Sequence, residues 1–77
     1  MSYGYTLNLV LLNKSASARS LGVKLGRICI KHGVPVVEVA ERLGVSRQSV
    51  YGWFSGRTKP NVHMAARIEK FIIRLEP

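Results

Sequence analysis

Acidic residues are scarce in this chain. Only 4 Asp and Glu residues stand against 12 Lys and Arg, so the 77-residue sequence carries a formal net charge of +8. In a domain this small, such a surplus favours a polyanionic partner, and nucleic acid is expected ahead of an anionic membrane surface. The few carboxylates, the 2 histidines and the single cysteine form no acid–base pair and no activated nucleophile, so we expect no enzymatic activity.

Cysteine and long apolar runs are also rare. With one cysteine, Cys29, the chain cannot form an internal disulfide, which fits a reducing cytoplasm. Cys29 and His32 lie on one helical face, but no second pair of ligands accompanies them, so we expect neither a metal site nor a cofactor. No apolar run approaches the roughly 20 residues that a membrane-spanning helix needs. The length implies one domain with a modest core, which would gain stability from a partner subunit.

The stretch from Val39 to Trp53 has the pattern of two short helices joined by a tight turn. Ala40 is small where the two helices would cross, and Gly44 sits where the first must end in a left-handed conformation. Ser46 is a good N-cap for the second helix, because its hydroxyl can accept a hydrogen bond from a free backbone N–H. The apolar residues that recur at helical spacing on both sides of the turn are Val39, Leu43, Val45, Val50 and Trp53. This is the plan of a helix-turn-helix.

Further helices flank this motif, so the expected fold class is all-α. The predicted helices cover residues 17–32, 35–43, 47–54 and 61–75. Gly33 and Gly56 are expected stop signals, and Asn61 is the expected N-cap of the last helix. Gly22 and Gly26 weaken the first of these helices by up to roughly 1 kcal/mol each relative to Ala, but they would permit close packing against another helix.

The N-terminal segment, residues 1–16, is predicted to be extended. The stretch 5–12 is rich in residues that favour a strand, with Leu7, Leu9 and Leu11 on one face. A lone strand leaves its backbone groups unpaired, and no second strand is apparent in the chain. The economical partner is the same segment of a second subunit, antiparallel across a two-fold axis, so these leucines are candidate dimerisation residues.

A short helix is the alternative for the same segment. In that case Leu7, Val10 and Leu11 would lie on one face. With either conformation, we expect the chain to divide into an N-terminal segment at 1–16 and a helical DNA-binding domain at 17–77.

Residues from about Leu21 to Ile72 resemble the Cro and phage-repressor-like helix-turn-helix domains, also called the XRE type. The stretch 53–60 is similar to the family's Trp-x-x-Gly-x-x-x-Pro ending of the recognition helix. The other residues that carry the resemblance are Ala40, Leu43, Gly44, Val45, Ser46 and Val50. The resemblance implies a compact four-helix fold like that of lambda repressor. Many members have a polar residue that donates to a DNA phosphate where this chain has Val36, beside Val37.

By this resemblance, the chain is expected to be a sequence-specific transcriptional regulator of a phage or a prokaryote. A Cro-like repressor would bind a near-palindromic operator as a homodimer, with recognition helix 47–54 in the major groove and half-sites about 34 Å apart. Its partner is double-stranded DNA, and no small-molecule effector is expected because the chain shows no ligand or cleavage domain. We expect it in the cytoplasm of a bacterial or phage-infected cell.

Two sets of residues are candidate DNA contacts. The resemblance places Arg47, Gln48 and Gly52 opposite base edges, and Tyr51 could touch bases as well. The Arg47 guanidinium can donate to O6 and N7 of guanine, and the Gln48 amide can pair with N6 and N7 of adenine, while Gly52 would allow close approach. The candidate phosphate contacts, which position the protein without specifying a sequence, are Ser46, Ser55, Arg57, Thr58 and Lys59.

Three other functions are compatible with the sequence. An antitoxin or a controller protein of a restriction-modification system would use the same DNA-binding end with another partner. A protein-interaction module would keep the fold and leave the DNA face idle, an alternative that Val36 and Val37 near the expected phosphate contact keep open. A non-specific nucleoid or recombination accessory would bind all sequences alike.

Overall fold

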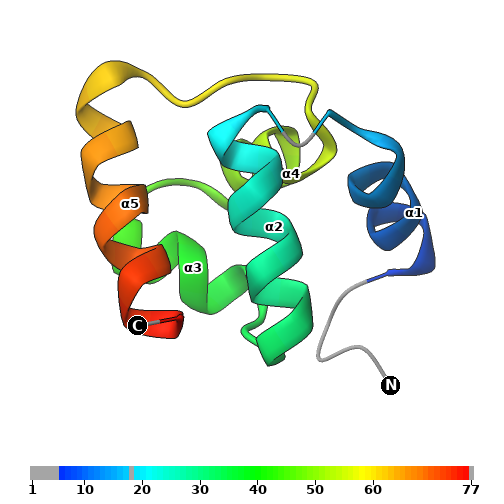
Figure 1. Cartoon of the computed structure of the whole chain (residues 1–77), viewed down its shortest axis with the longest axis horizontal. Coiled ribbons are helices and arrows are strands. Elements are labelled where there is room, and N and C mark those ends of the chain that lie inside the picture. Colours follow the sequence, from blue (N-terminus) through cyan, green and yellow to red (C-terminus); the bar gives the residue numbers. More distant parts are fainter. Residues whose placement is uncertain (1–5, 18, 77) are drawn as a thin grey trace.

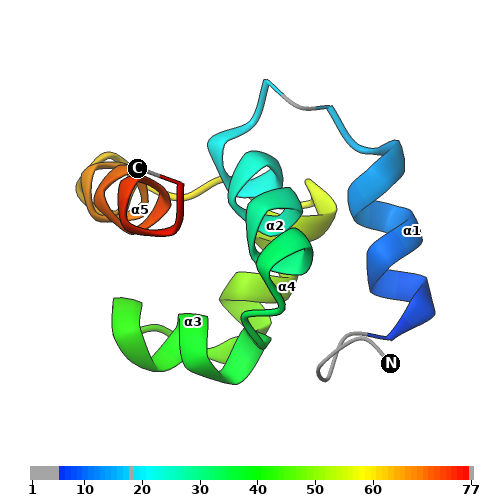
Figure 2. The same cartoon turned by 60° about the horizontal axis from the view of Figure 1, so that its bottom comes forward.

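The structure, a computed structural model, describes residues 6–17 and 19–76, and within these ranges every regular element is an α-helix. The elements are α1 (Leu7–Ser15), α2 (Leu21–His32), α3 (Val36–Leu43), α4 (Arg47–Ser55) and α5 (Val62–Leu75). α2 runs through the middle of the molecule, with α1 and α5 on opposite sides of it (Figures 1 and 2). The all-α prediction is confirmed, but α1 is a helix beyond the four that were expected. No described helix is both long and apolar enough to cross a membrane.

Three glycines end helices as the sequence predicts. Gly33, Gly44 and Gly56 follow α2, α3 and α4 with φ angles of 69°, 69° and 81°. Glycine adopts this left-handed conformation without the Cβ clash that other residues suffer, so the chain can reverse direction immediately after each helix. The start of α2 differs from the prediction, because the helix begins at Leu21 and not near Ser17.

Side-chain caps fix the starts of the helices around the predicted recognition helix. The Ser46 hydroxyl accepts a hydrogen bond of 3.1 Å from the Ser49 N–H at the start of α4. The Asn61 side chain accepts one of 2.8 Å from the Met64 N–H at the start of α5. Both N-caps were expected, and each satisfies a backbone donor that the helix itself leaves free.

The core forms where α2 and α4 meet α3 and α5. Its largest fully buried side chains are Val23, Leu25, Cys29, Val39, Val50, Phe54 and Ile68. Burial, with the charge of Glu38 as a second cause, raises the pKa of Cys29 to about 12. The thiol therefore stays neutral at physiological pH and acts as a small apolar residue in the core.

α2 and α4 approach each other closely at the two glycines of α2. A Cβ atom on Gly22 would lie 2.7 Å from the Cβ of Trp53, and one on Gly26 would lie 2.8 Å from the Cγ of Phe54. Any larger residue would push the two helices apart, because interiors as dense as this one have no room for an extra methyl group. The predicted role of these glycines in close packing is confirmed.

The N-terminal segment is a helix, so the prediction that it forms an extended strand is wrong. The Thr6 hydroxyl accepts a hydrogen bond of 3.1 Å from the Leu9 N–H and caps α1. Leu9 is only 6% exposed and packs in the core, whereas Leu7 is 73% exposed and Leu11 is 55% exposed. The helical alternative was correct in type, but the face that it assigned to the apolar residues is not the buried one. Tyr5, which the strand prediction included, lies outside the described residues.

Two polar side chains hold α1 in place. Asn13 is 2% exposed, and its Nδ2 donates to the carbonyl oxygens of Phe54 at 2.7 Å and Val23 at 3.1 Å. Arg27 of α2 donates through Nη2 to carbonyl oxygens in and just after the last turn of α1, including that of Ala16 at 2.8 Å. Because hydrogen bonds of Asn13 and Arg27 hold α1, the helix does not require a continuous apolar stripe. Apolar periodicity therefore did not reveal it.

Candidate nucleic-acid interface

α4, the predicted recognition helix, has one buried face and one exposed face. Val50 and Phe54 have no exposed surface and Trp53 is 6% exposed, so this side of the helix belongs to the core. Arg47 and Gln48 are exposed in the first turn. Since the buried face fixes the helix, the exposed side chains project from a rigid support.

Tyr51 and Ser55 continue the exposed face along the helix. Tyr51 is 37% exposed, and it follows Gln48 at helical spacing. The Ser55 hydroxyl donates to the Gly52 carbonyl oxygen at 3.3 Å and is half-buried. The outer surface of α4 therefore offers a guanidinium, an amide and a phenol in succession, which together can donate to and accept from the edges of base pairs.

Gly52 does not belong to this exposed face, and its predicted approach to a base is corrected. It is buried, and a Cβ atom there would collide with the Thr58 side chain. The backbone N–H groups of Arg57 and Thr58 also donate to the Gly52 carbonyl oxygen, at 3.0 and 3.2 Å. The absence of a side chain at this position thus lets the following loop fold back onto α4.

That loop carries the predicted phosphate contacts. Arg57, Thr58 and Lys59 are all exposed and lie next to the end of α4. The predicted contact Ser46 lies at the other end of α4, where its hydroxyl caps the helix and lies 3.1 Å from the Ser49 hydroxyl. The candidate contacts therefore flank the outer face of α4 at both ends.

The first turn of α3 has no side chain that could donate to a phosphate, because its one polar residue is the acidic Glu38. Val36 is 4% exposed and belongs to the core, while Val37 is 45% exposed. Val36 therefore cannot supply the side-chain phosphate contact that the resemblance implies at this point.

The charge distribution favours an anion at the outer face of α4. Residues 42–68 contain no acidic residue but include Arg47, Arg57 and Lys59. The first acidic residues on either side, Glu41 and Glu69, lie in α3 and α5. The candidate contacts thus occupy a stretch with basic and no acidic residues, where a polyanion would meet little like-charge repulsion.

A groove separates α1 from α4. It has a volume of roughly 550 Å³, and Thr6, Asn8 and Leu12 line its α1 side while Gln48 and Tyr51 line its α4 side. The sequence prediction missed the α1 residues because it treated the segment as a dimerisation strand. Thr6 was the available signal, since threonine is among the residues preferred at a helix N-cap and this one directly precedes an apolar run.

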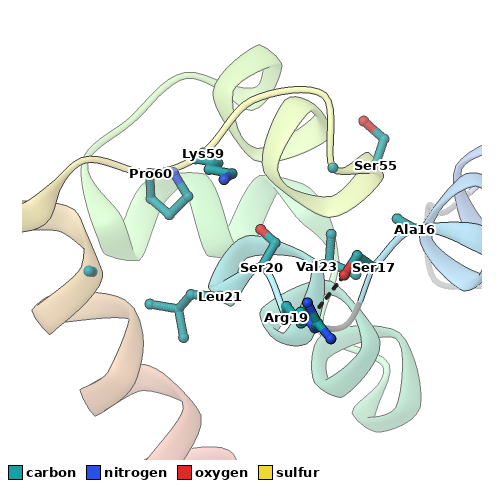
Figure 3. A pocket seen from close by; sticks show the side chains of 11 residues that line it. Ala16, Ser17, Arg19, Ser20, Leu21, Val23, Ser55, Lys59 and Pro60 are labelled. Carbon is teal, nitrogen blue, oxygen red and sulfur yellow. Dashed lines mark hydrogen bonds between the residues drawn. The ribbon is translucent and has the colours of Figure 1, made fainter.

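A second hollow lies behind the loop that follows α4. Figure 3 shows Lys59 on one side of this hollow and Arg19 on the other, with Ser20 between them. The backbone N–H of Arg19 donates to the Ser17 hydroxyl at 3.3 Å. Arg19, which the sequence prediction did not single out, adds positive charge near the loop at 57–59.

The remaining predicted residues have different environments. Leu9 is part of the core and cannot also contact a second subunit, so its assignment to a dimer face is corrected. Leu7 and Leu11 stay exposed one helical turn apart on α1. Within residues 6–17 and 19–76, no group of three or more His, Cys, Asp or Glu side chains could hold a metal ion.

Comparison with known families gives one match. A family model described as helix-turn-helix matches residues 23–72, which extend from α2 into α5 and include both helices of the predicted motif. α1 lies outside the matched residues. No curated protein and no solved structure matches the chain.

Proposed function

Since this chain belongs to the XRE-type helix-turn-helix family, whose members are DNA-binding regulators, we propose that it is a Cro-like repressor. In this proposal a homodimer binds a near-palindromic operator, and α4 of each subunit enters the major groove. Bound at a promoter, the dimer would block the access of RNA polymerase. The proposal includes no catalytic role, no cofactor and no small-molecule effector.

The two-faced structure of α4 is the observation that carries this proposal. Its buried residues fix the helix to the core, and its exposed residues lie in a stretch without acidic side chains. We assign base reading to Arg47, Gln48 and Tyr51. A guanidinium suits the O6 and N7 acceptors of guanine, and a side-chain amide suits the N6 and N7 pair of adenine.

Phosphate binding is assigned to the residues that flank this face. Arg57, Thr58 and Lys59 supply charge and a hydroxyl from the exposed loop, with Ser55 and Ser46 at the two ends of α4. Such contacts set the position and orientation of the protein on the duplex but carry no sequence information directly. Substitutions of the base-reading residues should therefore change sequence preference, whereas substitutions of the phosphate-binding residues should weaken binding to all sequences.

The homodimer is the second part of the proposal. Leu7 and Leu11 form an exposed apolar pair on α1, and we assign them to the contact between subunits. A two-fold dimer would place the two copies of α4 about 34 Å apart, so the half-sites should be separated by about one turn of the duplex.

Selection of bound sites from random DNA tests the proposal. Wild-type protein should enrich one near-palindromic sequence, and Arg47→Ala should lose about 1–3 kcal/mol of specific affinity and relax the preference at one base position. Lys59→Ala should weaken binding to all sequences alike and reduce the salt dependence. If no sequence were enriched, the regulator assignment would fail, and a protein-interaction module would be favoured in its place.

A further inference from the structure

We propose that α1 is a second DNA-contacting element, and that the groove between α1 and α4 receives the sugar-phosphate backbone at the edge of the major groove. Asn8 is the principal contact from α1. This inference rests on the proposed function of α4, and it adds a partner surface that lies outside the family-matched residues 23–72.

The groove continues the proposed recognition surface. Gln48 and Tyr51 line it from α4, and both also belong to the exposed face assigned to base reading. From the opposite wall, Asn8 and Leu12 face the same space one turn apart on α1. A duplex that placed bases against Gln48 would therefore bring its adjacent backbone against Asn8.

The widths of the major groove and of a helix indicate that the groove between α1 and α4 receives sugar-phosphate backbone and not base pairs. The major groove is about 12 Å wide and admits one helix, and a helix with its side chains is about 10–12 Å in diameter. With α4 inside the groove, α1 has no room beside it and has to lie over one of the two bordering strands. The proposed contact from α1 is therefore made to phosphates.

The chemistry of the groove also fits a phosphate. Its lining contains no acidic residue, and Arg57 contributes a positive charge. Asn8 is exposed, and its amide can donate to a phosphate oxygen, as can the hydroxyls of Thr6 and Thr58. An apolar peptide segment would leave these polar groups unpaired, so DNA is the better occupant.

α1 is held firmly enough to act in this way. The Asn13 amide donates to the Phe54 carbonyl oxygen at 2.7 Å, which ties α1 directly to α4. Arg27 ties the end of α1 to α2 through the Ala16 carbonyl oxygen at 2.8 Å. Asn13 and Arg27 are positioning residues, because they set the width of the groove without lining it.

Two substitutions with the same change in net charge provide the test. Asn8→Asp adds a negative charge inside the groove, at the start of a helix where an acidic residue favours the fold. Lys70→Gln removes a positive charge from exposed α5, which lies across the molecule from α1 (Figure 1). Binding of each variant to the enriched operator duplex is measured by titration, with Asn8→Ala as a variant that only removes the donor.

We expect Asn8→Asp to weaken operator binding at least about tenfold and Asn8→Ala severalfold, while Lys70→Gln should change it by less than about twofold. Equal losses for Asn8→Asp and Lys70→Gln would overturn the inference, because only net charge would then matter. If the wild-type protein enriched no operator, the proposed function itself would have failed, which is a distinguishable result.

Phosphate ethylation interference on the wild-type complex gives an independent measurement. Ethylation should interfere at backbone phosphates beside each half-site, and part of this interference should disappear in Asn8→Ala. A pattern identical in wild-type and Asn8→Ala protein would overturn the assignment of α1 even if both proteins bound the operator.

Discussion

α1 and α2 both pack against α4, but the two contacts are made by different chemistry. α2 meets α4 through the bare backbone of Gly22 and Gly26, so that the helices nearly touch. α1 contributes a single buried leucine, Leu9, to the core and meets α4 through the Asn13 amide, which donates to the Phe54 carbonyl oxygen. Loss of close packing between α2 and α4 affects the whole core, whereas loss of the Asn13 hydrogen bond can release α1 alone. The two contacts should therefore differ in what their loss does to the molecule.

The largest effect should come from breaking the α2–α4 contact. In Gly22→Ala, the better helix propensity of alanine would stabilise α2 by up to about 1 kcal/mol. The new Cβ, however, meets the Cβ, carbonyl oxygen and Cα of Trp53, of which the last two are backbone atoms that cannot rotate away. We expect overpacking of roughly 1–3 kcal/mol to exceed the gain and lower the free energy of unfolding.

Denaturant unfolding followed by circular dichroism measures this effect. Lys24→Ala is the matched control, because Lys24 is exposed on the same helix and its replacement should change stability by less than about 0.5 kcal/mol. A more stable Gly22→Ala protein would mean that α2 and α4 are not in close contact in solution.

A smaller and more local effect should follow from breaking the α1–α4 contact. Asn13→Ala removes the donor to the Val23 and Phe54 carbonyl oxygens. Because water can satisfy these carbonyls once α1 moves away, we expect the free energy of opening α1 to fall by about 1–2 kcal/mol with little change elsewhere.

Native-state hydrogen exchange separates local from global opening. The amides of α1 should exchange faster in Asn13→Ala, while those of α2 and α4 should keep their protection. Lys14→Ala, at the exposed neighbouring position, should leave α1 unchanged. Equal loss of protection in α1 and α4 would show that both contacts belong to one cooperative unit.

The smallest effect concerns the other end of the chain. The Glu76 carboxylate accepts hydrogen bonds from His32 at 2.9 Å and Lys31 at 3.0 Å. These bonds, with that of His32 as the larger cause, lower the pKa of Glu76 from its ordinary value of 4.5. Because the pKa of Glu76 is lower in the folded state than in the unfolded state, ionised Glu76 stabilises the fold above about pH 4.5. This contribution is lost as the pH falls through the pKa that Glu76 has in the folded protein.

The wild-type protein should therefore be slightly more stable to heat than Glu76→Gln near neutral pH, and the two proteins should become equally stable in acid. The contribution is small because Glu76 is exposed and water screens its charge. Thermal unfolding of both proteins between pH 2.5 and about 7 provides the measurement. A difference that grew as the pH fell would contradict this assignment.

The sequence predicted close packing at Gly22 and Gly26 without identifying α4 as the partner helix, and it did not predict the α1–α4 contact, for a physical reason. Helix ends are encoded locally, so Gly44 and Ser46 could be identified from conformational preference and capping alone. Gly22 and Gly26 were recognisable because two glycines inside a helix demand a packing explanation. The position of α1 depends on Asn13, whose partners lie 10 and 41 residues away in the sequence, and no local pattern reveals such a pairing.

The same distinction applies to the candidate DNA-binding surface. Arg47 and Gln48 were placed correctly on the exposed face of α4, since helical periodicity alone separates them from Val50 and Trp53. Gly52 was misplaced because its environment is set by Thr58 on the following loop.

The separation of α4 into a buried face and an exposed face also limits which of its residues can be replaced. Substitutions at Val50, Trp53 or Phe54 would damage the core, and any side chain at Gly52 would displace the loop. The outer positions of α4 that can vary without damage to the core include Arg47, Gln48, Tyr51 and Ser55. A combinatorial library restricted to these codons should consist mainly of folded proteins.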